Sequence, residues 1–275
     1  MTRFGNSNRF TVGLFLLVFH LITPSTTYAD DFVVGTQDIA YLPYYNFPST
    51  HDKGVGWAIL EAFAKESGHT FEYVVMPVNR LQIELNKGNL DFVFPDNERW
   101  NKHIDSVMGK IYSNALIDSF AVTLVKTENI NRPLSHIKRL AIPQGFTPAK
   151  WTDLIASKQV NVNEVENVYQ GLRYLQSDTV DAMDVEYNVA KRYEERFAQL
   201  GPFTADLTLP HNSVAFCLSS LKHPALIEEF NTFLSTHKTL IEEIKQQYHI
   251  ASTQDVIEEN KRIQKIDNED IWRSQ

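Results

Sequence analysis

Hydrophobic residues in the first part of the chain follow two alternating spacings, one typical of strands and one typical of helices. Short runs rich in β-branched and aromatic residues predict strands at 31–36, 70–76 and 91–94. Apolar residues at helical spacing predict helices over 57–66 and 78–88. The resulting βαβαβ order favours a parallel sheet with right-handed crossovers.

The same alternation returns after residue 120 and predicts a second α/β unit. Strands are expected at 120–125, 139–143, 159–162, 181–186 and 212–218, and helices from Pro148, over 165–175, over 190–197 and over 224–234. Two α/β units in one chain imply two lobes. Residues 248–275 are rich in charge, so we expect them to be loosely attached.

The N-terminus has the pattern of a secretory signal peptide. Arg3 and Arg9 precede an almost unbroken apolar run over 10–22, and Ala29 is followed by acidic residues. The alternative is an anchor that is never removed, but the run is shorter than the roughly 20 residues that span a bilayer. We therefore expect a signal peptide over 1–29, cleavage near Ala29 and a periplasmic mature protein.

Charge and cysteine content narrow the classes of partner and chemistry. The formal net charge is −8, which makes nucleic acid an unsuitable partner. The single cysteine, Cys217, lies in an apolar stretch and is expected to be a buried small hydrophobe rather than a nucleophile. Because one cysteine cannot form an internal disulfide, stability must come from packing.

A series of short motifs recurs in one order along both α/β units. The motifs are Pro43-Tyr44, Gly56-Trp57, Gly88-x-x-Asp91, Glu98-Arg99, Tyr112-Ser113, Gln144-Gly145-x-Thr147 and Asp181-Ala182-x-x-x-Glu186. Together they resemble the family 3 extracellular solute-binding proteins, many of which bind polar amino acids. The stretch Phe94-Pro95-Asp96-Asn97-x-x-Trp100 resembles a divergent subgroup of that family.

The resemblance implies a two-lobed, type II periplasmic binding protein fold, in which each lobe is a mainly parallel sheet flanked by helices. It implies a first lobe over 30–113 and 212–250, a second lobe over 114–211 and a charged tail over 251–275. Two chain crossings, near Ser113 and Asn212, would form the hinge. Such a fold places strand ends and helix starts around one crevice, where a ligand can be buried.

The resemblance also points to ligand contacts in the second lobe. Thr147 matches a position where a backbone N–H and a hydroxyl meet a ligand carboxylate, and the alternative is a simple helix cap. Glu186 matches an acidic residue that pairs with the ligand ammonium in amino-acid binders. Its alternative is a solvated residue that starts the next helix.

In the first lobe, Arg99 matches the arginine that clamps the ligand carboxylate. The Ser/Thr-rich loop that usually precedes this arginine is missing here, because Asp91 leads directly into 92–99. Arg99 suits a bidentate carboxylate contact, and the alternative is an exposed arginine on a short helix.

The remaining cleft candidates are aromatic and polar residues that would suit a small organic ligand. They are Tyr44, Tyr45, Trp57, Arg80, Asp96, Asn97, Trp100 and Tyr112. Aromatic residues lie in the core more often than in a cleft. Asp96, Asp184 and Glu186 together would make the cleft acidic, which favours a cationic or amine-bearing ligand. The alternative for Asp184 is the exposed face of its strand, although positions 184 and 186 share one face.

Motifs of catalysis and metal binding are not found in the sequence. There is no His-x-x-x-His or His-x-His pair, no Gly-x-Ser-x-Gly elbow, no Walker loop and no dinucleotide fingerprint. We expect no enzyme activity, no cofactor and no metal. The leading hypothesis is a monomeric receptor that delivers a polar amino acid or related amine to an inner-membrane ABC permease. The alternatives are a sensory protein that docks on a membrane signalling receptor, and a scaffold or hydrolase that uses the cleft otherwise.

Overall fold

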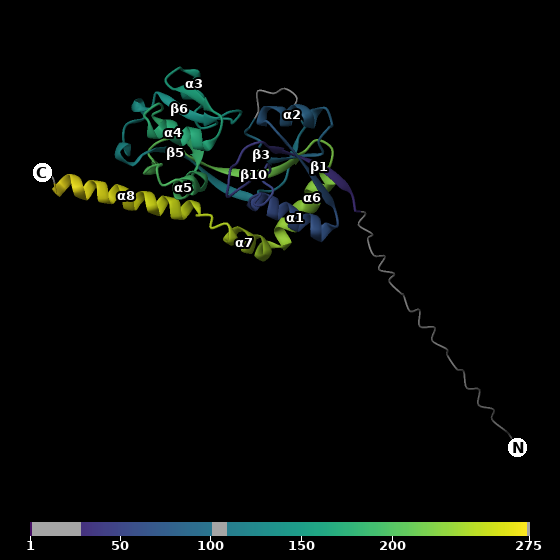
Figure 1. Cartoon of the computed structure of the whole chain (residues 1–275). Coiled ribbons are helices and arrows are strands. Elements are labelled where there is room, and N and C mark those ends of the chain that lie inside the picture. The colour runs from purple at the N-terminus through teal and green to yellow at the C-terminus, as the bar shows by residue number, and fades with distance from the viewer. Residues whose placement is uncertain (2–28, 101–108, 274–275) are drawn as a thin grey trace.

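The computed structural model describes residue 1, residues 29–100 and residues 109–273. Almost all of the expected signal peptide, 1–29, lies outside the described residues. The chain forms two α/β lobes that lie side by side, and both are crossed by long strands (Figure 1). No helix among the described residues has the length and apolar character that a membrane span requires.

The first lobe is built on a parallel core of three strands. Its strands are β1 (Asp31–Gln37), β2 (Thr70–Met76) and β3 (Phe92–Asp96), and its helices α1 (Val55–Ser67) and α2 (Val78–Asn86) form the two crossovers. Strand β1 pairs in parallel with both β2 and β3. The βαβαβ order predicted from the hydrophobic spacing is therefore present. Helix α1 ends at Gly68, whose φ of 80° lies in the left-handed region that favours glycine.

The second lobe repeats this plan. Its elements are β5 (Ile117–Lys126), β6 (Arg139–Pro143), α3 (Thr152–Ala156), β7 (Asn161–Val165), α4 (Val168–Gln176), β8 (Ala182–Glu186), α5 (Tyr187–Arg196) and β9 (Phe203–Ala205). Strand β6 pairs in parallel with β7 and β8, and β5 pairs antiparallel with β8. Short 3-10 turns at Thr127–Asn129 and Leu134–His136 connect β5 to β6.

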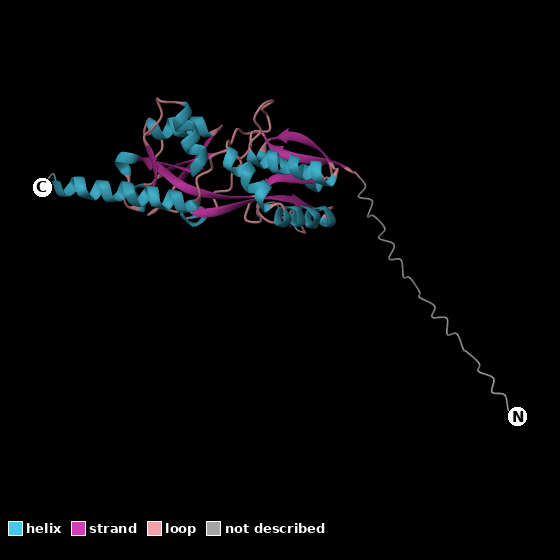
Figure 2. Cartoon of the chain, turned by 90° about the horizontal axis from the view of Figure 1, so that it is seen from below, coloured by secondary structure: helices cyan, strands magenta, loops and turns pink. Residues whose placement is uncertain are grey.

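One strand joins the two lobes into a continuous sheet. The N-terminal half of β10 (Asn212–Ser220) pairs with β5, and its C-terminal half pairs with β3 and with β4 (Ile111–Tyr112). The sheet order is β2-β1-β3-β10-β5-β8-β6-β7. Figure 2 shows the long strands that run between the lobes. After β10 the chain returns to the first lobe as α6 (Pro224–Thr236) and α7 (Lys238–Gln247), which contact β10 and α1.

Several element bounds differ from the prediction: α5 begins at Tyr187 rather than at 190, and β7 is Asn161–Val165 rather than 159–162. Two further helix starts differ for local reasons. Residues 148–151 form a turn, so α3 begins at Thr152 rather than at Pro148. Helix α4 begins at Val168 rather than at Val165, because Val165 is the last residue of β7 and pairs with Pro143. Asn167 then caps α4 by accepting a hydrogen bond from the Gln170 backbone N–H at 3.0 Å.

The C-terminal segment packs against the second lobe, contrary to the expected loose attachment. It forms the long helix α8 (Thr253–Arg273), which runs along that lobe and projects past it (Figures 1 and 2). Val256 is buried against Phe120, Val122 and Tyr187, and Asn260 donates a hydrogen bond to the backbone oxygen of Ala205. The high charge of this segment led to the wrong prediction, because a helix needs only a few apolar residues to bury one face.

Cys217 lies on β10 and is buried. Burial raises the pKa of its thiol to about 12, which suppresses the reactive thiolate. The side chain is therefore a packing residue, in line with the apolar stretch around it.

Candidate functional site

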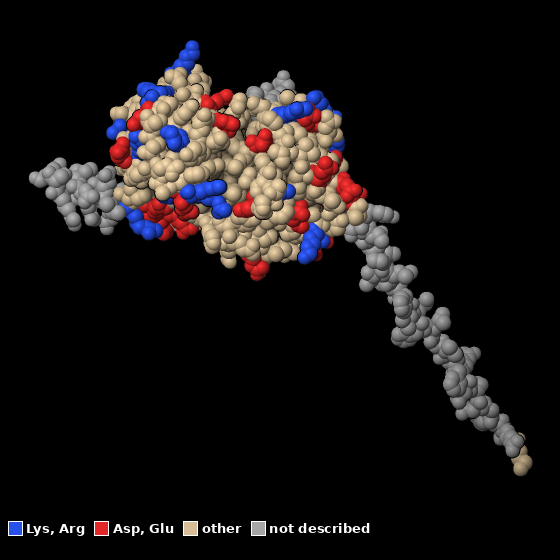
Figure 3. Space-filling view, viewed as in Figure 1, with Lys and Arg blue, Asp and Glu red and all other residues tan. Residues whose placement is uncertain are grey.

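A cavity of about 80 Å³ lies where the two lobes meet, and both lobes line it. The first lobe contributes Gln37, Tyr41, Tyr45 and Arg99, and the second contributes residues near Thr147 and at the end of β8. Figure 3 shows the lobes meeting along a furrow whose visible walls are mostly uncharged. Gln37 and Glu186 are the last residues of parallel strands, and this edge is where α/β proteins usually bind ligands.

Glu186 is enclosed by hydrogen-bond donors of the protein itself. Its Oε1 atom accepts from the Tyr44 hydroxyl at 2.6 Å, from the Phe120 backbone N–H at 3.2 Å and from Asn188 Nδ2 at 3.2 Å. Its Oε2 atom accepts from the Val189 backbone N–H at 3.0 Å and so caps α5. Burial raises the pKa of Glu186 to about 7, although these four hydrogen bonds act in the opposite direction.

The Tyr44–Glu186 hydrogen bond connects the two lobes, because Tyr44 follows β1 and Glu186 ends β8. Asn188 extends the connection to the C-terminal segment. Its Nδ2 atom donates to the Tyr44 hydroxyl at 3.0 Å and to the Ala251 backbone oxygen at 3.1 Å. Glu186 is thus a structural junction as well as a cavity-lining residue.

Lys150 and Asp184 form an ion pair on the cavity wall of the second lobe. Lys150 comes from the turn before α3, and Asp184 lies on β8 two residues before Glu186. Both side chains are mostly shielded, with exposed fractions of 7% and 14%. Since the two charges neutralise each other, Asp184 does not make the cavity acidic.

Arg99 lines the cavity from the first lobe and is half-buried. Its Nη2 atom donates to the Ser213 backbone oxygen at 2.8 Å, and its Nε atom lies 3.4 Å from Asn97 Oδ1. Arg99 forms no ion pair with a described residue. Its guanidinium therefore retains a net charge and donors that a ligand can use.

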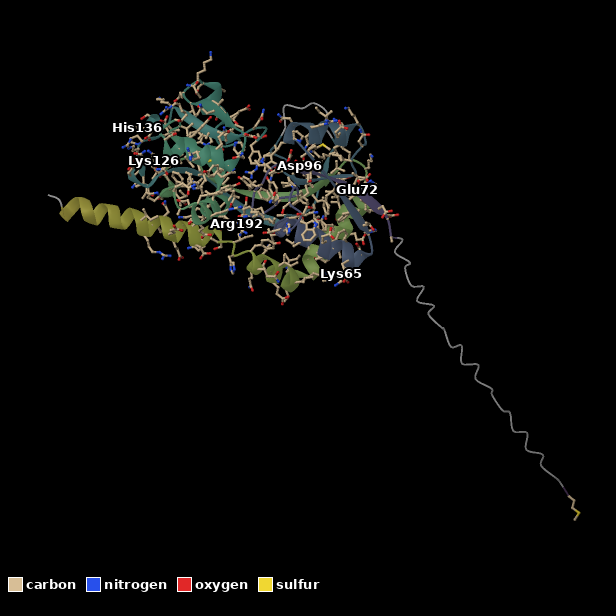
Figure 4. The ribbon with its side chains drawn as sticks, viewed as in Figure 1. Lys65, Glu72, Asp96, Lys126, His136 and Arg192 are labelled. Atoms are coloured by element: carbon tan, nitrogen blue, oxygen red, sulfur yellow. The ribbon has the colours of Figure 1, made fainter. Side chains whose placement is uncertain are left out.

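Asp96 lies inside the first lobe, away from the cavity lining (Figure 4). It pairs with Lys110 at 2.5 Å, and only 1% of each side chain is exposed. The Ser219 hydroxyl donates to the same carboxylate at 2.6 Å, and Gln82 Oε1 accepts from Lys110 at 2.7 Å. Asp96 is therefore part of a closed network that joins β3 to β10.

The residues named from the sequence as ligand contacts or cleft candidates divide into two groups. The cavity is lined by Tyr45, Arg99, Trp100, Thr147, Asp184 and Glu186, whereas Arg80 lies outside the lining and pairs with Glu84. Also outside the lining are Tyr44, Trp57, Asp96, Asn97 and Tyr112. The Tyr44 hydroxyl donates to Glu186, and Asn97 donates to the Ala215 backbone oxygen. The ammonium groups of Lys53 and Lys110 lie over the rings of Trp57 and Tyr112, respectively. The short stretch after Asp91 therefore lines the cavity through Arg99 and Trp100, and Asn97 anchors it to β10.

Sequence reasoning missed several cavity residues. Gln37, Tyr41, Ser119, Lys150 and Phe216 line the cavity, but none of them was among the predicted site residues. For Gln37 a usable signal was present, since it directly follows the parallel strand predicted over 31–36, at the edge that faces the crevice. Lys150 carried no such signal, because its position depends on the turn that replaces the first turn of the expected helix.

No protein-family model matches this sequence, and neither does any curated protein. Solved structures do match. An arginine transport system periplasmic binding protein from Legionella pneumophila superposes with a TM-score of 0.63 at 15% identity, over 80% of this chain and 100% of that chain. The BvgS VFT2 domain of Bordetella pertussis gives 0.62 at 16% identity, over 79% and 93%. An ancestral amino acid-binding protein, described as a precursor of cyclohexadienyl dehydratase, gives 0.61 at 18% identity, over 79% and 94%.

The chain has the two-lobed type II periplasmic binding protein fold. The resemblance seen in the motifs is thus supported at the level of the fold, and several of the similar structures are of amino acid-binding proteins. Identities of this size establish the architecture and leave the ligand to the chemistry of the cavity. In the described part of the chain, no group of three or more His, Cys, Asp or Glu side chains could hold a metal ion.

Proposed function

We propose that this protein is a periplasmic solute-binding protein that encloses a small polar ligand between its lobes and delivers it to an inner-membrane ABC transporter. The observation that carries the proposal is the cavity at the lobe junction, lined by both lobes and by a mixture of aromatic and polar side chains. The motif resemblance adds an amino acid or a related amine as the expected ligand class.

The connections between the lobes support a closing motion. We assign 30–113 and 212–250 to the first lobe, 114–211 to the second and 251–275 to a C-terminal segment that packs on the second lobe. Strands β5 and β10 pair with each other at the lobe junction, so bending both strands there would close the lobes on a ligand. Periplasmic location follows from the predicted signal peptide over 1–29.

A sensory role is the second candidate, in which the closed form docks on a membrane signalling receptor. The similarity to the BvgS VFT2 domain favours it, because that match is as good as the match to a transport protein. The two roles share the cavity and differ in the partner of the closed form. Uptake of the identified ligand should fall in a deletion strain if the role is transport, and should be unchanged if the role is sensing.

Thermal-shift measurements on refolded, ligand-free protein test the binding function. At about 100 times its Kd a ligand adds roughly 2.7 kcal/mol, which for a chain of this size raises the Tm by about 5 to 10 °C. A panel of amino acids, amines and organic acids should contain at least one such compound. The bound compound should be recovered chemically unchanged, because the proposal assigns binding rather than catalysis to the cavity.

A matched pair of variants links the shift to the cavity. Ala149 is exposed and lines the cavity, so Ala149→Trp should fill it and abolish the shift. Ala156 is an exposed residue at the end of α3, away from the cavity lining, and Ala156→Trp should leave the shift intact. A shift that survives Ala149→Trp would place the ligand elsewhere, and a panel without any shift would count against the proposed function.

A further inference from the structure

The acidic side chains of the cavity are already matched by donors of the protein. Glu186 accepts four hydrogen bonds, all from neutral groups, and is 2% exposed. Asp184 is paired with Lys150. A ligand ammonium that approached Asp184 would lie beside the Lys150 ammonium, and two like charges in contact with the same carboxylate repel each other. Neither of the two acidic side chains therefore offers a free carboxylate to a ligand ammonium.

Two hydrogen-bond donors of the cavity, in contrast, have no acceptor among the described residues. Gln37 is 3% exposed, and its Oε1 atom accepts from the Tyr45 hydroxyl at 2.7 Å, which leaves its amide nitrogen without a described partner. Tyr41 is 4% exposed, and its oxygen accepts from the Glu186 backbone N–H at 3.1 Å. Nothing in the described part of the chain accepts the Tyr41 proton. Both residues line the cavity, so these donors can bind an acceptor of the ligand there.

The charge of the cavity points the same way. Arg99 supplies a guanidinium without a described ionic partner, whereas the Lys150–Asp184 pair is neutral as a unit. A carboxylate satisfies all of these requirements, because it is acceptor-only and suits a guanidinium. Aromatic side chains of Tyr41, Phe146 and Phe216 supply the apolar part of the lining.

The volume limits the size of the ligand. One water position needs about 10 to 15 Å³ of such space, so a cavity of about 80 Å³ holds a molecule of roughly five to eight non-hydrogen atoms. This range includes three- and four-carbon acids, such as a 2-hydroxy acid or a short dicarboxylate.

We propose that the ligand is a short-chain carboxylate without an amino group, held by Arg99 and by the unpaired donors of Gln37 and Tyr41. This inference rests on the proposed solute-binding function and narrows its ligand class. It replaces the amine that an acidic cleft would have favoured.

Isothermal titration of the refolded full chain with matched pairs of compounds tests the inference. L-Lactate and L-alanine differ in a hydroxyl against an ammonium, and L-2-hydroxybutyrate and L-2-aminobutyrate differ in the same way. At least one acid should bind, and its amino counterpart should bind at least about tenfold more weakly. Equal or tighter binding of the amino compound would overturn the inference, and tight binding of an amino acid or amine would do so while leaving the solute-binding function intact. If no acid, amino acid or amine binds, the proposed function itself fails.

A variant of Gln37 tests the donor assignment separately. Gln37→Glu keeps the shape and still accepts the Tyr45 hydroxyl, but it replaces the unpaired amide donor by a carboxylate. Binding of the acid should fall at least about tenfold, since like charges would then face each other. Gln159→Glu makes the same chemical change at an exposed position and should leave the affinity unchanged. Unchanged affinity in Gln37→Glu would remove Gln37 from the ligand site.

Discussion

Two lysine–aspartate pairs, one in each lobe, look alike in composition and differ in purpose. Lys110–Asp96 lies inside the first lobe with 1% of each side chain exposed, and Ser219 and Gln82 complete its hydrogen bonds. Lys150–Asp184 lies on the cavity wall with 7% and 14% exposed. The first pair joins β3 to the residue before β4, and Ser219 ties it to β10. The second pair neutralises an acid where the ligand is proposed to bind. Burial and surrounding partners, rather than residue type, separate a structural pair from one that sets selectivity.

Removal of Lys110 should have the largest effect. Lys110→Met leaves Asp96 buried without its counter-charge, and breaking a buried pair in this way costs about 3 to 5 kcal/mol. Urea unfolding measures this loss directly. The double variant Lys110→Met with Asp96→Asn removes both charges and should recover much of the stability. A loss below about 1 kcal/mol in the single variant would place this pair with ordinary surface ion pairs.

Glu186 should produce the next largest effect, seen as a pH dependence. Its pKa rises from 4.5 to about 7 in the folded protein, chiefly through burial. The folded state therefore binds more protons than the unfolded state between these values, so stability falls as the pH rises from about 4.5 to 7. The full shift corresponds to a loss of about 3 kcal/mol. Denaturant unfolding across this range measures the slope.

Glu186→Gln is the control for this slope, because it cannot ionise. The variant should lose most of the fall in stability between pH 4.5 and 7. A smaller fall should remain from Glu194, whose pKa is also raised by burial. The same slope in both proteins would show that Glu186 does not titrate in this range.

The sequence predicts the fold of this protein better than it predicts the partners of its buried acidic residues. Strand and helix spacing predicted the α/β order and the two lobes, since burial on one or both faces is written into residue spacing. Asp96 and Asp184 could not be told apart, because each partner lysine is set by tertiary contacts that join segments 14 and 34 positions apart. Glu186 was predicted as an ammonium partner, but its donors come from Tyr44, Phe120, Asn188 and Val189, and only the fold brings these together.

Lys150→Met should change stability less and selectivity more. The pair is shielded less completely than Lys110–Asp96, so the loss should be about 2 kcal/mol, between that of a surface pair and that of Lys110→Met. The freed Asp184 carboxylate would then give the cavity an acidic group. The ratio of the affinity for an amino compound to the affinity for its acid counterpart should consequently rise at least about tenfold over that of the unaltered protein. Titration with L-alanine and L-lactate measures this ratio. An unchanged ratio would show that Lys150 does not determine the selectivity between acids and amino compounds.

Arg139 and Asp181 form a third pair, which extends the comparison to the surface of the second lobe. Their exposed fractions are 45% and 22%, and Asp181 also accepts hydrogen bonds from the backbone N–H groups of Lys138 and Arg139. Because water screens the charges and these backbone donors remain, Arg139→Met should cost about 0.5 kcal/mol. Urea unfolding at low and high salt measures the loss, which should shrink as salt rises. A loss as large as that of Lys110→Met would show that burial does not decide how much an ion pair contributes to the free energy of unfolding in this protein.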